Sequence, residues 1–254
     1  MLACYAEEKK NQRSETLPYR TTQAIVLQRV DWRESDRILT LFSPEAGRVD
    51  ALCRGCRKPK SPLLAAAELF TLGEYVLFSG KGKEYVQSCQ VIEGFYPLRL
   101  DYPRLAAAAL MGSACLKVIQ PEEPMGHLFI LLARSLKRLA YEDTPLEAVT
   151  SAFLLHFVTL QGVKPRLNHC VRCGKTMGEQ EGGFLMPDED GICCAGCGDR
   201  APRRSWLTDL QLSWLRDVIT LGIDKTDLAL KTYPHHLLKQ YTEYKLETRL
   251  PDLH

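Results

Sequence analysis

The sequence predicts an α+β multidomain protein in which a small β-barrel is followed by an α-helical domain that carries a Cys4 zinc module. Three observations predict this class. Short segments rich in β-branched and aromatic residues fill roughly the first third of the chain. Apolar residues then recur at helical spacing, and two Cys-x2-Cys hooks interrupt the helical part. The chain has 254 residues, 45% of them hydrophobic and 25% charged, which suits a globular protein of more than one domain.

A barrel is expected over residues 20–98, after a polar N-terminal arm of residues 1–19. Five segments in this range have strand composition, and turn residues such as Pro44 and Gly47 separate them. Five short strands so close together are typical of a small closed barrel. The expected strands are 22–30, 36–42, 47–53, 68–78 and 84–92.

Helices are expected from residue 99 onward, in two parts that a cysteine-rich segment separates. The first part covers 99–165, the Cys4 insertion covers 166–204 and the closing helices cover 205–254. Pro103 suits the first turn of a helix, and Thr208 suits an N-cap. The apolar spacing places helices at 102–118, 126–139, 145–162, 208–221 and 235–246.

The two cysteine hooks predict one structural Zn²⁺ ion. Cys170 and Cys173 form the first hook, and Cys194 and Cys197 form the second. A two-residue gap lets both thiolates of a hook reach one ion, and two hooks complete a tetrahedron. Four protein ligands leave no position for water or substrate, so this ion is expected to hold structure rather than to catalyse. Cys193 is an alternative to Cys194, but its three-residue gap to Cys197 is less regular.

The ten cysteines also bear on the compartment. No apolar leader precedes them, and no stretch of about 18 apolar residues predicts a membrane span. We therefore expect a reducing cytoplasm, where thiols are metal ligands or buried small side chains. Cys53 and Cys56 form a third hook without a partner pair, for which burial is expected and a redox or metal role is the alternative.

Charge points to one stretch of the chain. The net charge of +2 is too small for a protein that is basic throughout. Between residues 48 and 60, however, five cations face a single acid, Asp50, in a loop after the third expected strand. A cationic loop on a small barrel suits a phosphate backbone, although a solvated loop is the simpler alternative. The five cations are Arg48, Arg54, Arg57, Lys58 and Lys60.

Taken together, these motifs resemble the RecO family of bacterial recombination mediators over about residues 20–250. The segment Arg33-Glu-Ser-Asp-Arg-Ile-Leu-Thr-Leu-Phe42 and the paired hooks carry most of the resemblance. The remaining matching motifs are Ala24-Ile-Val-Leu, Gly47-Arg, Arg54-Gly55, Arg57-Lys-Pro-Lys-Ser61, the glycine Gly174 after the first hook, and Gly182-Gly183-Phe184.

The resemblance implies an N-terminal OB-fold barrel, a helical domain and a zinc module, without enzymatic turnover. It implies binding of single- and double-stranded DNA and annealing of complementary strands in RecF-pathway repair, near the bacterial nucleoid. The implied partners are RecR and the C-terminal tail of the single-stranded DNA-binding protein (SSB), with RecA loaded indirectly. On the second expected helix, Arg134, Lys137 and Arg138 offer a contact site for that acidic tail, although a solvated helix face is the simpler alternative. The implied DNA contacts are Arg37, Arg54, Arg57, Lys58 and Lys60.

Three other classes were weighed against this interpretation. A zinc-ribbon transcription or translation factor would grip nucleic acid with the cysteine module, but residues 166–206 hold six cations and six acids. A zinc deaminase would need H-x-E together with P-C-x-x-C, and the sequence has no such pair. A scaffold that binds only protein stays open.

Overall fold

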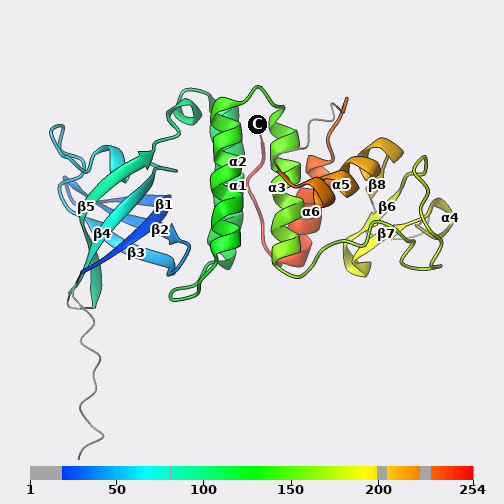
Figure 1. The fold of residues 1–254 in the computed structure, drawn as a ribbon, viewed down its shortest axis with the longest axis horizontal. Helices are drawn as coiled ribbons and strands as arrows, with labels where there is room; N and C mark the ends of the chain where they lie inside the picture. The colour runs from blue at the N-terminus through cyan, green and yellow to red at the C-terminus, as the bar shows by residue number, and fades with distance from the viewer. Residues whose placement is uncertain (1–18, 81, 199–204, 224–229, 254) are drawn as a thin grey trace, which may run out of the picture.

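The computed structural model describes residues 19–80, 82–198, 205–223 and 230–253, and it confirms the predicted α+β class. A β-barrel lies at one end of an elongated molecule, helices occupy the middle, and the cysteine-rich module lies at the other end (Figure 1). The first 18 residues of the expected polar arm lie outside the described residues, and Tyr19 already belongs to the first strand. No helix in the described ranges has the length and apolarity needed to cross a membrane.

The barrel is closed and OB-like, with strand order β1-β2-β3-β5-β4. Neighbouring strands are antiparallel except β3 and β5, which pair in parallel over two positions, and β1 pairs with β4 to close the ring. Closure leaves no strand with a free edge, which protects the sheet from pairing with other chains. The strands are β1 (Tyr19–Trp32), β2 (Asp36–Ser43), β3 (Gly47–Cys53), β4 (Leu72–Gly80) and β5 (Lys83–Glu93).

The run Ala24-Ile-Val-Leu is continuously apolar because β1 is buried on both faces there. Ala24 and Val26 belong to the barrel core, whereas Ile25 and Leu27 belong to the core of the helical domain. A strand covered on both sides loses the usual alternation of apolar and polar residues. This stretch of β1 therefore joins the two cores.

The fourth strand begins later than expected. Residues 68–71 form a turn rather than the start of a strand, and β4 begins at Leu72. Glu68 pairs with Arg29 and Arg37, while Phe70 adopts a left-handed backbone (φ 64°) and donates its N–H to the Val26 carbonyl oxygen. The ion pairs and this backbone turn outweigh the strand propensity of the segment.

All five expected helices are present, and their bounds differ from the predictions by a few residues at most. Asp101 accepts a hydrogen bond from the Arg104 N–H at the start of the first helix. Thr208 is an N-cap as predicted, and its hydroxyl and Gln211 form a capping box. The helices are α1 (Tyr102–Val118), α2 (Gly126–Tyr141), α3 (Leu146–Leu160), α5 (Asp209–Leu221) and α6 (His235–Lys245).

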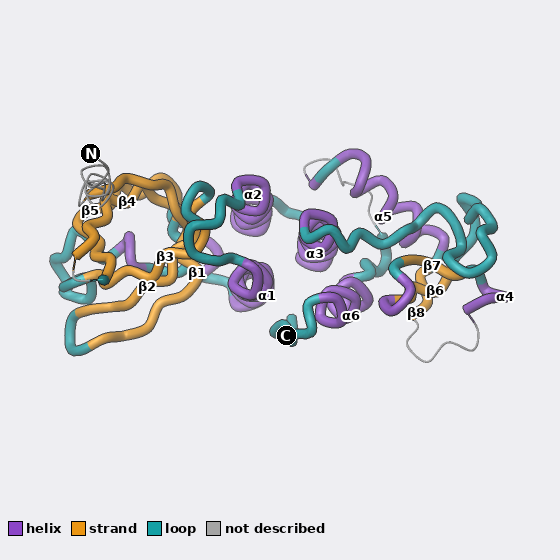
Figure 2. Tube along the Cα trace, turned by 90° about the horizontal axis from the view of Figure 1, so that it is seen from below, coloured by secondary structure: helices purple, strands orange, loops and turns teal. Residues whose placement is uncertain are grey.

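The cysteine-rich segment holds strands that the sequence did not predict. A three-stranded sheet of order β7-β6-β8 forms here, followed in the chain by helix α5 (Figure 2). Each strand is only three or four residues long, too short to show a period of two. The elements are β6 (Gly183–Met186), β7 (Gly191–Cys193), the short helix α4 (Ala195–Gly198) and β8 (Ser205–Leu207).

The barrel is fixed to the helices through the turn before β3. The Arg48 N–H donates to the Gln120 carbonyl oxygen at 3.0 Å, and Phe42 meets Phe129 edge to face at 5.6 Å. Gly47 has φ 62°, and a Cβ there would meet the carbonyl oxygens of Gln120 and Glu123. This close backbone approach requires glycine.

We predict that Gly47→Ala lowers the free energy of unfolding by more than about 2 kcal/mol, because left-handed strain and a backbone clash add. Gly82→Ala is the matched control, since Gly82 has φ 71° but open space around its missing Cβ. The control should lose only about 1–2 kcal/mol from the left-handed backbone. Urea unfolding of both variants measures the difference, and equal losses would contradict a close contact at Gly47.

Candidate nucleic-acid interface and metal centre

The basic loop, residues 54–62, is anchored by its backbone to the tip of the β1–β2 hairpin. The Arg57 N–H donates to the Ser35 carbonyl oxygen at 3.0 Å, and the Gly55 N–H donates to Asp36 Oδ1 at 2.8 Å. Two further turns inside the loop are closed by hydrogen bonds from Lys58 N–H to Gly55 and from Ser61 N–H to Lys58. The loop therefore presents its side chains from a fixed backbone.

Cys53 and Cys56 anchor the same loop to the barrel core. Both side chains are fully buried in the barrel core, beside Leu39 and Tyr75. Burial raises the pKa of both thiols, and Cys89 nearby is raised to about 11 for the same reason. A buried thiol with a raised pKa is a weak nucleophile and a weak metal ligand. This geometry fits the expected packing role of the third hook.

Arg37 lies beneath the loop and points inward. Its guanidinium pairs with Asp31 at 3.0 Å and with Glu68 at 2.9 Å, and its side chain is 14% exposed. Burial alone would lower the pKa of Arg37, but the hydrogen bonds that its guanidinium donates to Glu68 and Asp31 raise it. The hydrogen bond from Arg37 likewise lowers the pKa of Asp31. The resemblance implies that Arg37 contacts DNA. Its position in the structure suits it to hold the tip of the β1–β2 hairpin in shape.

The other four expected contacts are solvent-facing. Arg57 reaches Asp31 at 3.3 Å and is about one third exposed, and exposed pairs of this kind contribute only about 0–1 kcal/mol. Arg54 lies over the Tyr85 ring at 4.6 Å. Lys58 and Lys60 are exposed and have no carboxylate partner among the described residues. A phosphate can reach all four without breaking a buried ion pair.

The four expected metal ligands converge at the far end of the molecule. The sulfurs of Cys170, Cys173, Cys194 and Cys197 all lie within 4.8 Å of one another. Zinc–sulfur bonds of about 2.3 Å in a tetrahedron require sulfur–sulfur distances of about 3.8 Å, and the Cys173 and Cys194 sulfurs are 3.9 Å apart. Cys193 is buried in β7 and does not join the cluster.

The protonation of these thiols fits a cation site. Burial raises the pKa of Cys170, but N–H groups of Cys173, Cys194 and Arg172 more than offset this and lower it to about 6. The sulfurs of Cys194 and Cys173 raise the pKa of Cys197 to about 12. Four sulfurs this close cannot all ionise without a cation among them. The donor set and its spacing therefore fit a metal ion held by four thiolates.

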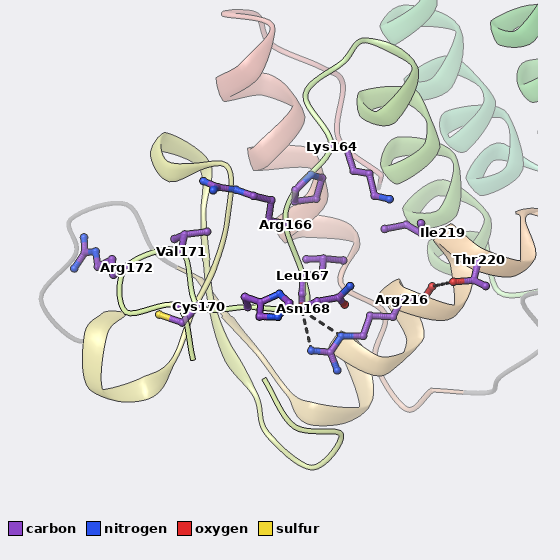
Figure 3. Close-up of a pocket in the computed structure, with 13 residues that line it drawn as sticks. Lys164, Arg166, Leu167, Asn168, Cys170, Val171, Arg172, Arg216, Ile219 and Thr220 are labelled. Carbon is purple, nitrogen blue, oxygen red and sulfur yellow. Dashed lines mark hydrogen bonds between the residues drawn. The ribbon is translucent and has the colours of Figure 1, made fainter. Parts of the chain in front are cut away.

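The module is fastened to helix α5 beside a cavity of about 930 Å³ (Figure 3). Arg216 on α5 donates to the carbonyl oxygens of Leu167 and Met177 at 2.8 and 3.2 Å. Arg172 pairs with Glu189 and also donates to the Cys197 carbonyl oxygen, which joins the two hooks. These cations bond to the module's own backbone and acids. These contacts indicate that the residues lining the cavity hold the module against the helices.

The expected contact site for the acidic tail on α2 is only partly exposed. Arg138 is 4% exposed and donates to Glu142 and to the Ile223 carbonyl oxygen. Its guanidinium is therefore part of the helical core, and this part of the expectation is wrong. Arg134 and Lys137 are exposed on the same helix.

Comparison with known proteins gives the family. Residues 18–95 match the family model described as Recombination protein O N terminal, and residues 99–254 match Recombination protein O C terminal. A protein of Desulforamulus reducens is 30% identical over 232 residues, 89% of this chain and 90% of the relative. One from Desulfitobacterium hafniense is 33% identical over 205 residues, 80% and 74% of the two chains.

A third relative, from Acetivibrio thermocellus, is 38% identical over 159 residues, and the match spans 63% of each chain, just under two thirds of the relative's length. All three relatives are named DNA repair protein RecO. The two family models together match nearly every described residue, from the barrel to the closing helices. The chain therefore belongs to the recombination protein O family of DNA repair proteins.

Proposed function

We propose that this chain is a non-enzymatic recombination mediator that binds single- and double-stranded DNA and anneals complementary strands. The observation that carries the proposal is the basic loop on the OB-like barrel. Arg54, Arg57, Lys58 and Lys60 point to solvent from a fixed backbone, and no buried acid in the described part of the chain neutralises them. Cations placed in this way neutralise phosphates and release counterions, whatever the base sequence.

Annealing requires two polyanions to approach each other. A cationic surface reduces their repulsion, so two strands held near one barrel can meet at a higher local concentration. Phosphate contacts leave the Watson–Crick edges free to pair. A rigid loop suits this task because its cations need not be ordered again at each encounter.

Family membership also supports a place in the loading of RecA. We propose RecR and the acidic C-terminal tail of SSB as partners, with RecA acting on the strands that they release, in the bacterial compartment that holds the chromosome. Arg134 and Lys137 on α2 remain candidate contacts for the tail because both are exposed. Arg37 is proposed as a positioning residue that shapes the loop through Asp31 and Glu68.

We propose that the four-thiolate cluster holds one structural Zn²⁺. The ion would supply cross-linking between the two hooks and leave no open coordination position. Its place is far from the basic loop (Figure 1). Zinc is therefore expected to stabilise the module and its docking on α5 rather than to touch DNA.

The basic loop gives the first test of this function. We predict that Lys58→Ala/Lys60→Ala weakens binding to every single-stranded sequence and flattens the dependence of log K on log salt by up to about 1.4, because two phosphate contacts are lost. Fluorescence anisotropy at several salt concentrations measures both values. The matched control is Lys117→Ala/Lys231→Ala, two exposed lysines outside the barrel. An unchanged slope in the loop variant would refute the loop as the phosphate contact.

Annealing itself is the second test. Two complementary oligonucleotides, one carrying a quenched fluorophore, should pair faster with the chain than without it, and the acceleration should fall in the Lys58→Ala/Lys60→Ala variant because fewer phosphates are neutralised. The same reaction with SSB-coated strands tests the proposed partner. A chain that binds DNA without accelerating pairing would favour a scaffold role.

The adjacent residues Cys193 and Cys194 allow a test of the proposed zinc ligands. We predict that Cys194→Ser loses bound zinc and loosens the module, whereas Cys193→Ser keeps one zinc per chain, because only Cys194 faces the other three ligands. Zinc content by inductively coupled plasma mass spectrometry and protease resistance of residues 166–198 measure the two effects. Equal zinc content in the two variants would contradict the assigned ligand set.

A further inference from the structure

The outer face of the barrel carries an apolar row that passes through all five strands. In an antiparallel sheet, side chains directly opposite each other lie on the same face. The strand register places aromatic or aliphatic residues opposite one another at five successive pairings. In order round the barrel they are Tyr19 with Phe78, Phe78 with Tyr85, Tyr85 with Leu52, Leu52 with Ile38, and Ile38 with Val30.

This row, here called the apolar belt, faces outward. Its neighbours along the strands are buried in the barrel core, for example Leu77, Val86 and Ala51. Tyr19 is 55% exposed and Val30 is 49% exposed. The solvent face of such a sheet normally carries polar side chains. A continuous apolar row there indicates a surface that contacts a ligand.

Trp32 extends the belt and lines a groove. It follows Val30 by two residues on β1, so it projects from the same face, and it is 45% exposed. The groove, of about 540 Å³, lies between Trp32, Ile38 and Leu52 on one side and the β4–β5 hairpin, including Lys83, on the other. A planar group of the size of a nucleobase fits a hollow of this volume.

The acids of the groove are already paired within the barrel. Asp50 accepts hydrogen bonds from Arg48 at 2.9 Å and from Thr40 at 2.7 Å. Glu84 accepts from Ser79 at 2.8 Å and from Arg20 at 3.4 Å. Lys83 is exposed without a carboxylate partner among the described residues. The groove therefore does not repel an anionic strand.

The belt is continuous with the basic loop. The Arg54 guanidinium carbon of that loop lies 4.6 Å from the centroid of the Tyr85 ring. The centroids of the Tyr85 and Phe78 rings are 6.2 Å apart. Arg54 thus covers one face of the Tyr85 ring, and neither of these two residues lines the groove beside Trp32. Exposed aromatic rings beside cations are the combination that holds a single strand, through base stacking and phosphate contacts together.

We propose that this groove binds unpaired nucleobases, with Trp32 as the stacking residue. The proposal rests on the proposed DNA-binding function and adds a means to prefer single strands over duplex. Bases of a duplex already stack on each other and cannot reach a ring on the protein without unpairing. The basic loop would hold phosphates of either form, and the belt would add affinity only where bases are free.

A comparison of two strands of equal charge separates the contribution of the belt to affinity from the contribution of the basic loop. One oligonucleotide carries thymine bases, and the other has the same number of phosphates with abasic sugars. The full-length chain should prefer the thymine strand by about ten-fold, since stacking on an exposed ring is lost without bases. In Trp32→Ala this preference should fall towards unity, while affinity for the abasic strand and the salt slope stay unchanged. Trp32→Phe, which keeps a ring, should retain most of the preference.

Tryptophan fluorescence gives an independent readout with a matched control. Trp206 on β8 is 46% exposed, nearly the same as Trp32, but it lies in the cysteine module. Thymine strands should quench the wild-type chain and Trp206→Phe, and the quenching should disappear in Trp32→Phe. Quenching that persists in Trp32→Phe and disappears in Trp206→Phe would overturn the proposal.

The remaining outcomes separate a failure of the base-binding groove from a failure of the proposed DNA-binding function. Salt-dependent binding with equal affinity for the thymine and abasic strands would overturn the belt and leave the basic loop in place. Absence of salt-dependent binding to either strand would defeat the proposed function itself. Self-association in sedimentation that Trp32→Ala abolishes, together with equal affinities, would assign the belt to a second copy of the chain and overturn the proposal.

Discussion

Closure of the five-stranded barrel is the constraint on which the remaining structure depends. A closed barrel divides each strand between its core, its neighbours and solvent, and here the helical domain covers one side of β1 and β2. The run at residues 24–27 belongs to both cores, and the Gly47 turn fixes the barrel against the α1–α2 connection. Away from this contact the described part of the barrel has exposed residues, among them Tyr19, Val30 and Ile92. The residues of the basic loop and of the apolar belt lie outside the core that the barrel shares with the helical domain, and the described helices leave them uncovered.

The closed barrel also explains the role of the third cysteine hook, Cys53 and Cys56. Cys53 ends β3 facing inward, and Cys56 returns to the core after one turn of the loop. Two small apolar side chains thus pin the base of a loop whose other residues are charged. The C-terminal hooks follow identical spacing with the opposite outcome, because their sulfurs point at one another in a module too small for a core of its own. The two-residue spacing allows both thiols of a hook to reach one metal ion. The surrounding fold determines whether they meet other thiols or pack in a core.

Local signals were sufficient for most of the fold. Helical periodicity, the Thr208 cap and the composition of the strands depend on neighbours a few residues away, and they predicted the barrel and five helices. Long-range partners decided the rest. Arg37 reads as one more surface cation until Glu68, thirty-one residues later, turns back to meet it. The apolar belt depends on the pairing register of all five strands, which the residues Val30, Ile38 and Leu52 do not reveal one by one.

Two kinds of contact on one surface also bear on how strands could be exchanged. Phosphate contacts weaken with salt and hold paired and unpaired DNA alike. Stacking on a ring is available only to a base that has not yet paired. If the groove binds bases as proposed, pairing with a complementary strand would withdraw the bases from the belt while the loop keeps its phosphate contacts. The duplex would then lack the stacking contribution to its affinity and would dissociate more readily than the separate strands. Such a surface would favour annealing over long-lived binding of either strand, because its affinity would fall as the duplex forms.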